Sequence, residues 1–398
     1  MEDNQAKRTP GGVPFPQKAL RWVREHGKLP EDGITRWLLG MIAAALVAAL
    51  LGYWIYNRVH LFDQYQVLKS SVQNDVEGTR YCMIGDRILK YGHDGVFCVN
   101  TSNEVLWSIA YSMQTPVSSV CQGKCVIAEQ QGRKVYILDK NGLVGNYEAS
   151  MNIRKACVGA GGVTALLLDD EETSWINLYN INGEQIASVR ATLEDTGYPL
   201  DIAVTPNAKK LLVSSISTAD GVLTGNILFY DFSSSSSDRH LMQTLSYPNT
   251  LFPEVYYASG QLPVAVGDHG YMIYSTEKRP SERTAVSFEK EIISCFHDSD
   301  NIGFLFEGDE IGERYQMEVY NTSGKRTMRT GCSVEYEDVR AEDGEILLSS
   351  ASGMYSWRVS GKQKMELDYE KEVRFFAPLG SRRYLVITQD SMDQIRIV

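Results

Sequence analysis

The sequence predicts an all-β fold built from a repeated four-stranded unit and preceded by one apolar helix. Two observations support this prediction. A strand–turn pattern returns at a nearly regular interval after residue 64, and residues 37–56 contain no charged side chain. The chain has 398 residues, of which 43% are hydrophobic and 22% are charged, a composition typical of a globular protein with a sizeable core.

The apolar stretch WLLGMIAAALVAALLGYWIY (residues 37–56) predicts a transmembrane helix. At about 1.5 Å per residue its length matches the roughly 30 Å hydrocarbon core of a bilayer. Charged and aromatic residues stand at its ends, as expected at membrane interfaces: Arg36, Trp37, Tyr53, Trp54, Tyr56 and Arg58. A cleaved signal peptide is the main alternative, but its apolar region is shorter and is followed by small residues. We therefore expect an uncleaved signal anchor, with the lipid bilayer as its partner.

Basic residues near this segment predict the orientation of the chain. Five Lys/Arg lie between residues 18 and 36, whereas Arg58 and Lys69 follow the segment. The positive-inside rule then places the N-terminus in the cytoplasm and the C-terminal domain outside the cell membrane. The predicted organisation is a largely disordered cytoplasmic tail (1–36), the transmembrane helix (37–56), a linker (57–63) and the extracytoplasmic domain (64–398).

The repeat consists of a strand ending in an aromatic or aliphatic residue, a polar turn and a further strand. VYILDKNGLV (135–144), INLYNINGEQIA (176–187) and MEVYNTSGKR (317–326) are clear examples. The residues that end the strand align at intervals of roughly 40 to 50 positions, which is typical of β-propeller blades: Val99, Leu138, Tyr179, Tyr230, Tyr274, Tyr320, Trp357 and Ile397.

These intervals predict an eight-bladed β-propeller, with seven blades as the alternative. The last repeat has room for three strands, near 373–377, 383–388 and 394–398, whereas a spare strand, QYQVLKSSV (64–72), precedes the first complete repeat. Pairing a terminal strand into the last blade closes a propeller and removes exposed sheet edges. We therefore expect the strand near 64–72 to complete the last blade. A loop insertion with five consecutive serines is expected near 233–240.

Seven cysteines are too few for a disulfide scaffold. Cys121 and Cys125 frame the expected hairpin turn Gln-Gly-Lys. The sequence leaves open whether they form a disulfide or are separate thiols in adjacent strands.

The repeat resembles those of PQQ-like and WD40-like propellers, although it lacks the recurring Trp-Asp and Gly-His of WD40 repeats. Together with the basic tail and the single anchor, residues 37–398 resemble a family of uncharacterised signal-anchored propeller proteins from Gram-positive Firmicutes. This resemblance implies an extracytoplasmic bacterial domain. It rests on repeat rhythm, and it assigns no catalytic residues.

Few residues suggest chemistry. His93, His269 and His297 lie in the turn-like contexts YGHDG, GDHG and HDSDN, and an acidic loop, EGDEIGE, spans 307–313. His–Asp pairs are expected to join hairpins by hydrogen bonds, although convergence on a central channel would allow a metal or catalytic site. The acidic loop is expected to be a solvated hairpin tip. We predict no catalytic, metal or cofactor site.

These features favour a binding or scaffold module over an enzyme. The net charge is −11, and residues 1–36 carry an excess of basic residues, so the remainder is still more acidic. Such a domain repels nucleic acid. We expect an envelope protein or a cell-wall component as the ligand. The alternatives are a glycan-acting envelope enzyme, which needs two converging carboxylates, and a ligand-sensing protein.

Overall fold

The computed structural model describes residues 33–170, 173–219, 221–233, 240–380 and 382–398, apart from a few side chains at the two ends of its helix. The chain divides into two units, Met1–His60 and Leu61–Val398. The predicted tail, up to residue 32, and most of the serine-rich insertion, 234–239, lie outside the described residues.

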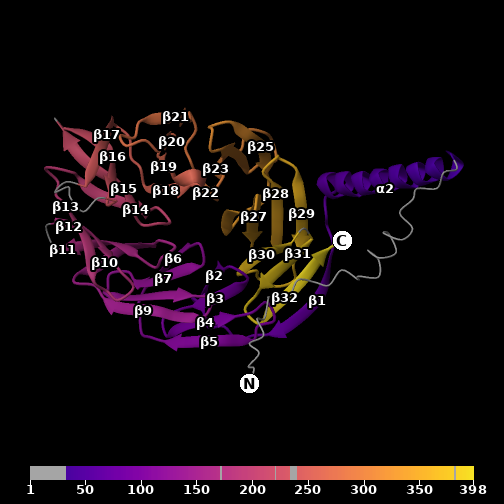
Figure 1. Ribbon diagram of the computed structural model, residues 1–398, viewed down its shortest axis with the longest axis horizontal. Coiled ribbons are helices and arrows are strands. Elements are labelled where there is room, and N and C mark those ends of the chain that lie inside the picture. Colours follow the sequence, from indigo (N-terminus) through magenta and orange to yellow (C-terminus); the bar gives the residue numbers. More distant parts are fainter. Residues whose placement is uncertain (1–32, 171–172, 220, 234–239, 381) are drawn as a thin grey trace, which may run out of the picture. The chain divides into compact units, whose positions relative to one another are not determined.

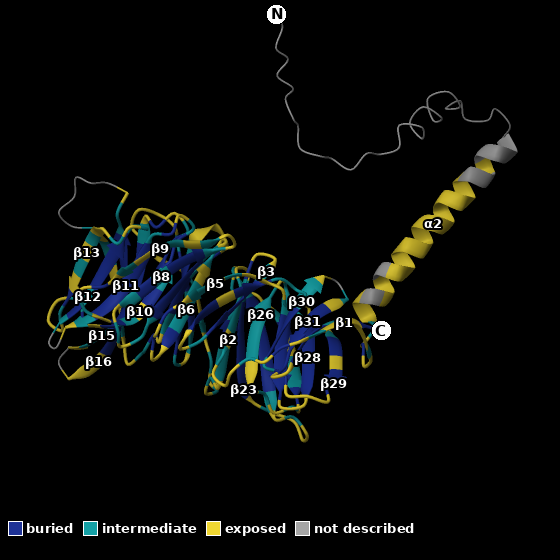
Figure 2. Ribbon diagram, turned by 90° about the horizontal axis from the view of Figure 1, so that it is seen from below, coloured by how far each residue is buried: buried dark blue, intermediate teal, exposed yellow. Residues whose placement is uncertain are grey.

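In the first unit, helix α2 (Gly33–Val59) contains the whole apolar stretch. Most of the described residues of α2 are exposed (Figure 2). They include Trp37, Tyr53, Tyr56 and Arg58, whereas the side chains of Arg36 and Trp54 lie outside the described set. Within the described part of the chain, no helix is long and apolar enough to span a membrane. The membrane anchor and the orientation therefore remain predictions.

The second unit is an all-β propeller of eight four-stranded antiparallel sheets (Figure 1). Blades 1 to 4 are β2 (Arg80–Ile84), β3 (Arg87–Tyr91), β4 (Gly95–Val99) and β5 (Val105–Ala110); β6 (Pro116–Cys121), β7 (Lys124–Glu129), β8 (Lys134–Asp139) and β9 (Gly142–Glu148); β10 (Asn152–Val158), β11 (Thr164–Asp170), β12 (Thr173–Tyr179) and β13 (Gln185–Ala191); and β14 (Tyr198–Val204), β15 (Lys210–Ala219), β16 (Val222–Asp231) and β17 (Leu241–Pro248). 

Blades 5 to 7 are β18 (Glu254–Ala258), β19 (Leu262–Gly267), β20 (Gly270–Tyr274) and β21 (Glu282–Ser287), with the 3-10 turn η1 (Ser259–Gln261) between the first two strands; β22 (Ser294–His297), β23 (Asn301–Glu307), β24 (Tyr315–Asn321) and β25 (Arg326–Cys332); and β26 (Asp338–Glu342), β27 (Glu345–Ser350), β28 (Gly353–Arg358) and β29 (Gln363–Asp368). The eight-bladed prediction is confirmed.

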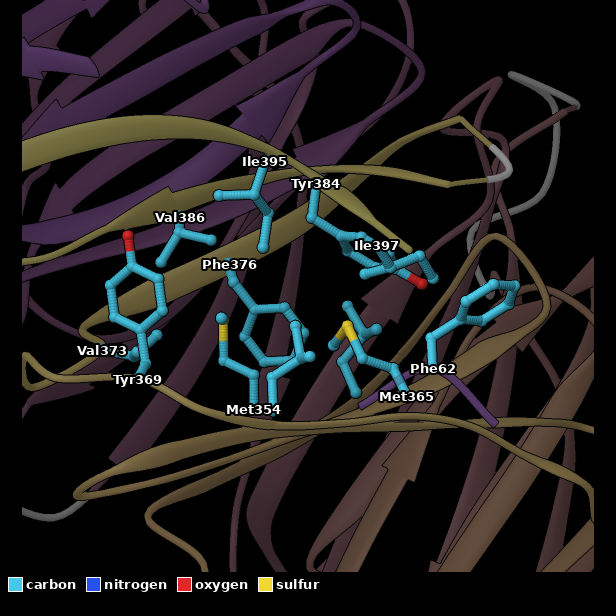
Figure 3. Packing of buried hydrophobic residues seen from close by; sticks show 12 residues of the cluster. Phe62, Met354, Met365, Tyr369, Val373, Phe376, Tyr384, Val386, Ile395 and Ile397 are labelled. Carbon is cyan, nitrogen blue, oxygen red and sulfur yellow. The ribbon is translucent and has the colours of Figure 1, made fainter. Parts of the chain in front are cut away.

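The eighth blade combines both ends of the propeller. Strands β30 (Phe375–Gly380), β31 (Arg383–Ile387) and β32 (Ser391–Ile397) are completed by β1 (Tyr65–Val72), which pairs antiparallel with β32 from Tyr65↔Ile397 to Val72↔Ser391. This is the closure expected of the spare strand. Phe62, within the stretch predicted as a linker, is 1% exposed, forms a bridge with Met365 and packs in the core between blades 7 and 8 (Figure 3).

The position used to align the repeats has a structural meaning. In each of the seven complete blades, the pairing of the third and fourth strands shifts register just before the aligned residue. In five blades the next residue is Asn or Asp, and its side chain accepts hydrogen bonds from backbone N–H groups of the following turn. The bulge and this turn together connect the third strand to the fourth, which explains why the repeat is visible in the sequence.

The core consists of layers between neighbouring blades. Each buried apolar cluster joins residues of two adjacent sheets, and the series runs around the whole ring. The cluster of Ile88 and Val99 in blade 1 with Phe375, Leu385 and Ile387 in blade 8 closes it. Burial of this apolar surface between blades is the main force that stabilises the ring.

Arginines on first strands add polar links between blades. Arg154 of β10 donates to the Pro199 carbonyl of β14, and Arg340 of β26 donates to the Phe376 carbonyl of β30. The Arg340 guanidinium lies 4.1 Å from the ring centroid of Phe375. Charge, backbone and aromatic contacts therefore join consecutive blades close to the axis.

Candidate functional site

A groove of about 670 Å³ lies where the closing blade meets blade 1. One wall is the connection 73–79, which leads from β1 to β2, and the other is the face of β3 and β4 that points toward blade 8. Val105, the first residue of β5, also lines the groove. Since β1 comes from the start of the propeller and β32 from its end, the groove lies at the seam where the ring closes. We call it the seam groove.

Phe97 of β4 is the most unusual residue of the seam groove. It lies two positions before the aligned residue Val99. The corresponding residues of the other blades are buried or half-buried: Tyr136, Asn177, Leu228, Met272, Glu318, Tyr355 and Ile395. Phe97 is 49% exposed. An aromatic side chain is thus exposed at a position that packs against the preceding blade in five other blades.

Further exposed apolar side chains line the groove together with the phenyl group of Phe97. Val76 of the connection is 70% exposed and Val105 is 61% exposed. Both line the seam groove with Phe97. Exposed apolar side chains that line one groove are candidates for contact with a ligand or partner. The aliphatic and aromatic groups supply the apolar part of such a site.

A buried lysine holds the connection in place. Lys90 of β3 is 5% exposed. Its Nζ donates to Gln73 Oε1 at 2.6 Å and Asn103 Oδ1 at 2.9 Å, and it lies 3.1 Å from Asp75 Oδ2. Burial lowers the pKa of Lys90, and the Asp75 carboxylate opposes this effect. Tyr81 donates a further hydrogen bond to Asp75 at 2.9 Å. The wall of the groove is therefore fixed by a satisfied polar network.

Acidic side chains outnumber Lys and Arg among the residues that line the seam groove. Asp75, Glu77 and Asp94 line it, and Lys90 is the basic residue among its lining residues. The Lys90 ammonium is already engaged by its three oxygen partners. His93 lies near Asp94, and its Nδ1 is 3.0 Å from the Met113 carbonyl. The groove thus combines apolar side chains with carboxylates.

A second polar cluster joins the first strands of blades 3 to 6. Lys155 Nζ lies 2.6 Å from Asp201 Oδ1, and Asp201 Oδ2 accepts the Val255 N–H. Burial raises the pKa of Asp201, with Lys155 opposing it. This carboxylate therefore connects three consecutive blades, β10 to β14 to β18.

Glu254 of β18 continues the cluster into blade 6. Its carboxylate contacts His297 Nε2 at 3.1 Å and accepts a hydrogen bond from Cys295 Sγ at 3.1 Å, while the His297 ring stacks on Tyr256. Burial acts against ionisation of Glu254, but His297 and Cys295 hold its pKa below the usual value. Burial and Glu254 raise the pKa of Cys295 to about 12, so its thiol is protonated and a poor nucleophile. These groups are arranged to join blades.

The other candidate residues take part in local structure. Asp298 accepts hydrogen bonds from the backbone of Asp300 and Asn301 in the β22–β23 turn. Asp309, in the acidic loop, pairs with Lys290 and Arg329. Asp268 and His269 face each other at 4.0 Å on the surface. Over the described ranges, no three His, Cys, Asp or Glu side chains are grouped to hold a metal ion.

The two cysteines of the predicted hairpin turn do not meet. Cys121 of β6 packs in the layer shared with blade 3, whereas Cys125 of β7 packs in the layer shared with blade 1. In the hairpin register Cys121 pairs with Lys124, and Cys125 with Val120. The two side chains therefore point to opposite faces of the sheet, and both thiols are free. Of the two alternatives, the structure favours separate thiols.

Similar structures support the propeller fold. They include BamB from Moraxella catarrhalis (TM-score 0.51, 11% identity, 84% of this chain and 100% of that chain), Sqt1 from Saccharomyces cerevisiae (0.56, 12%, 85% and 100%) and AztD from Citrobacter koseri (0.53, 10%, 74% and 87%). At this identity they are similar in fold alone. No curated protein matches the sequence.

A family model covers the propeller together with the end of the preceding helix. It matches residues 57–397, which include the closing strand β1, the seam groove and all eight blades. The match extends over most of the chain, and the protein therefore belongs to the family of unknown function DUF5711.

Proposed function

We propose that this protein is a membrane-anchored, extracytoplasmic binding module whose seam groove docks a segment of an envelope protein. The exposure of Phe97 carries the proposal, because in five other blades the residue at this position packs against the preceding blade. An exposed aromatic with aliphatic neighbours in a groove is the usual anchor point of a protein interface. The rigid ring presents this groove in one fixed geometry, which lowers the entropic cost of binding.

The groove chemistry suggests the class of partner. Val76, Phe97 and Val105 would contact apolar side chains, while Asp75, Glu77 and Asp94 give the groove a negative potential. Electrostatic complementarity then favours a segment that carries Lys or Arg beside its apolar residues. We commit to an extended apolar peptide flanked by basic residues. A neutral cell-wall glycan could donate hydroxyl hydrogen bonds to the carboxylates but would lack the charge complementarity of a basic segment.

The anchoring part of the proposal rests on helix α2. The uncharged residues 37–56 lie within one continuous helix of 27 residues, with Trp37 and Tyr53 exposed near its ends. The excess of Lys/Arg before the helix supports a cytoplasmic N-terminus. A propeller outside the membrane would then be held near envelope partners.

The enzyme alternative finds less support in the side chains. Asp201 and Glu254 are the carboxylates that lie on neighbouring first strands, and both are engaged by Lys155, His297 and backbone groups. A glycan-acting enzyme needs one carboxyl free to donate a proton and a second to act as base or nucleophile. The ligand-sensing alternative requires a response in the tail, which lies outside the described residues.

Site-specific crosslinking in cells tests the docking proposal. A photoreactive amino acid is placed at Phe97 in the full-length protein, and the matched control carries it at Ile186, a 53% exposed apolar residue of blade 3. We expect a partner captured at position 97 alone, with the crosslink on an apolar segment next to Lys or Arg.

Substitutions then test the chemistry. Using a synthetic peptide of the captured segment, F97E should weaken binding at least tenfold, and E77K should weaken it and reduce its dependence on salt. I186E is the control and should bind as the wild type does. Equal capture at both positions, or crosslinks to glycan or to acidic segments, would contradict the proposal. Separately, extraction of the full-length protein from membranes by carbonate would argue against the anchor.

A further inference from the structure

The structure brings two cysteines that are distant in sequence together between blades 1 and 2. Cys82 lies on the first strand of blade 1, β2, and Cys125 lies on the second strand of blade 2, β7. Both belong to the apolar layer between these blades, where Cys125 is fully buried and Cys82 is half-buried. Cys82 enters this layer from blade 1 and Cys125 enters it from blade 2, and each thiol is the largest influence on the pKa of the other.

From this juxtaposition we propose that Cys82 and Cys125 are an oxidisable pair that forms a disulfide between blades 1 and 2. Both side chains point into the same interblade layer from opposite sheets, so the bond would link two sheets that otherwise meet there mainly through apolar side chains. The inference is independent of the seam groove, which lies on the opposite face of blade 1. The disulfide is expected to form when the protein is in an oxidising compartment.

Other thiols in the region are excluded as partners. Cys98 belongs to the same layer, but Leu89 of β3 pairs with both Cys82 and Cys98, so these two cysteines are two strands apart. Two strand spacings amount to about 10 Å, beyond the reach of a disulfide. Cys121 points to the other face of its sheet, toward blade 3. Cys125 is thus the partner that geometry allows for Cys82.

The environment also sets the order of reaction. The hydrogen bond from Cys125 lowers the pKa of Cys82, burial opposes it, and the Ser118 hydroxyl lowers it further. The pKa of Cys125 is raised, first by its bond to Cys82 and then by burial. Cys82, which is both the more acidic and the more accessible thiol, is therefore the first nucleophile.

The exchange balances with a small disulfide as oxidant. The Cys82 thiolate attacks one sulfur of oxidised glutathione, forms a mixed disulfide and releases one glutathione thiolate. Cys125 loses its proton and attacks the Cys82 sulfur, which breaks the mixed disulfide and releases the second glutathione. The two protons of the cysteines end on the two glutathione molecules, and the two electrons reduce the oxidant.

Peptide mapping of the full-length protein tests the proposal. The folded protein is equilibrated with oxidised glutathione, free thiols are blocked, and unreduced digests are analysed by mass spectrometry. We expect one crosslinked peptide pair joining Cys82 and Cys125, lighter than the free peptides by two hydrogens. The bond closes a loop of roughly 40 residues, and the unfolding temperature should rise by about 3 to 6 °C on oxidation.

Variants separate this pair from other chemistry. C98S and C121S should keep the crosslink, whereas C125S should leave Cys82 as the mixed disulfide with glutathione. The proposal is overturned if wild-type Cys82 and Cys125 remain free after oxidation, if either joins another cysteine, or if wild-type Cys82 stops at the mixed disulfide. If F97E loses peptide binding in the seam groove but still forms the Cys82–Cys125 crosslink, that result bears on the proposed function and leaves the disulfide proposal unchanged.

Discussion

Replacement of Lys90 by Met should destabilise the propeller through the connection that closes it. The substitution keeps an unbranched side chain of similar length but removes the donor that Gln73, Asp75 and Asn103 share. Breaking a buried ion pair by removal of one partner costs about 3 to 5 kcal/mol. Asp75 keeps its hydrogen bond from Tyr81 and is 15% exposed, so we expect the lower limit, about 3 kcal/mol.

This free energy translates into a measurable shift. The unit Leu61–Val398 should unfold with an entropy change of roughly 0.7 kcal/mol/K, so the Tm of K90M should fall by about 4 °C. Thermal unfolding followed by circular dichroism measures it, with K140M as the control because Lys140 is an exposed lysine. A Tm within about 1 °C of the wild type, or an equal fall in K140M, would refute the reasoning that this network fixes the closing segment.

Three further predictions concern other parts of the ring. E254Q should lower the Tm at neutral pH. Because the pKa of the Glu254 carboxyl is depressed in the folded state, the difference in Tm between E254Q and the wild type should vanish as the pH falls through that pKa. A difference in Tm that stays constant with pH would contradict the assignment. G145A should cost more than 2 kcal/mol in urea unfolding, because a Cβ there would lie 2.0 Å from the Ile181 carbonyl oxygen; a change below about 0.5 kcal/mol would show that the backbone relaxes. F97S should change stability by less than about 1 kcal/mol, whereas Y355S, at the corresponding position of blade 7 and 8% exposed, should cost about 3 to 5 kcal/mol; equal losses would mean that Phe97 is part of the core.

The fold was predictable because each blade repeats a local feature. The aligned residues from Val99 to Trp357 follow a register shift, and several precede an Asn or Asp that organises the turn, so the repeat is recorded in neighbouring residues. The spare strand near 64–72 was equally readable, because the last repeat lacked a partner for it. Its pairing with β32 confirms that interpretation.

The candidate sites depend on which blade faces which, and a single sequence does not record this. Phe97 looks like any core aromatic until its neighbour is known to be the closing blade. Cys82 and Cys125 belong to different repeats, so their approach depends on the packing of two sheets. The sequence alone could have shown that Cys121 and Cys125 point to opposite faces of the sheet. A two-residue turn puts Cys121 opposite Lys124 and Cys125 opposite Val120, and side chains alternate between the two faces along a strand.

The pairing of β1 with β32 has a consequence for synthesis of the protein. Tyr65 is made before Ile397, its partner in the sheet, so the ring cannot close until Ile397 has left the ribosome. At about 5 to 20 residues per second, strand β1 waits for roughly 20 to 70 s with both of its edges unpaired. Contacts of such long sequence separation also form slowly. A newly made chain is therefore most prone to pair with a second copy during this interval, and a chaperone that covers β1 would act at that stage.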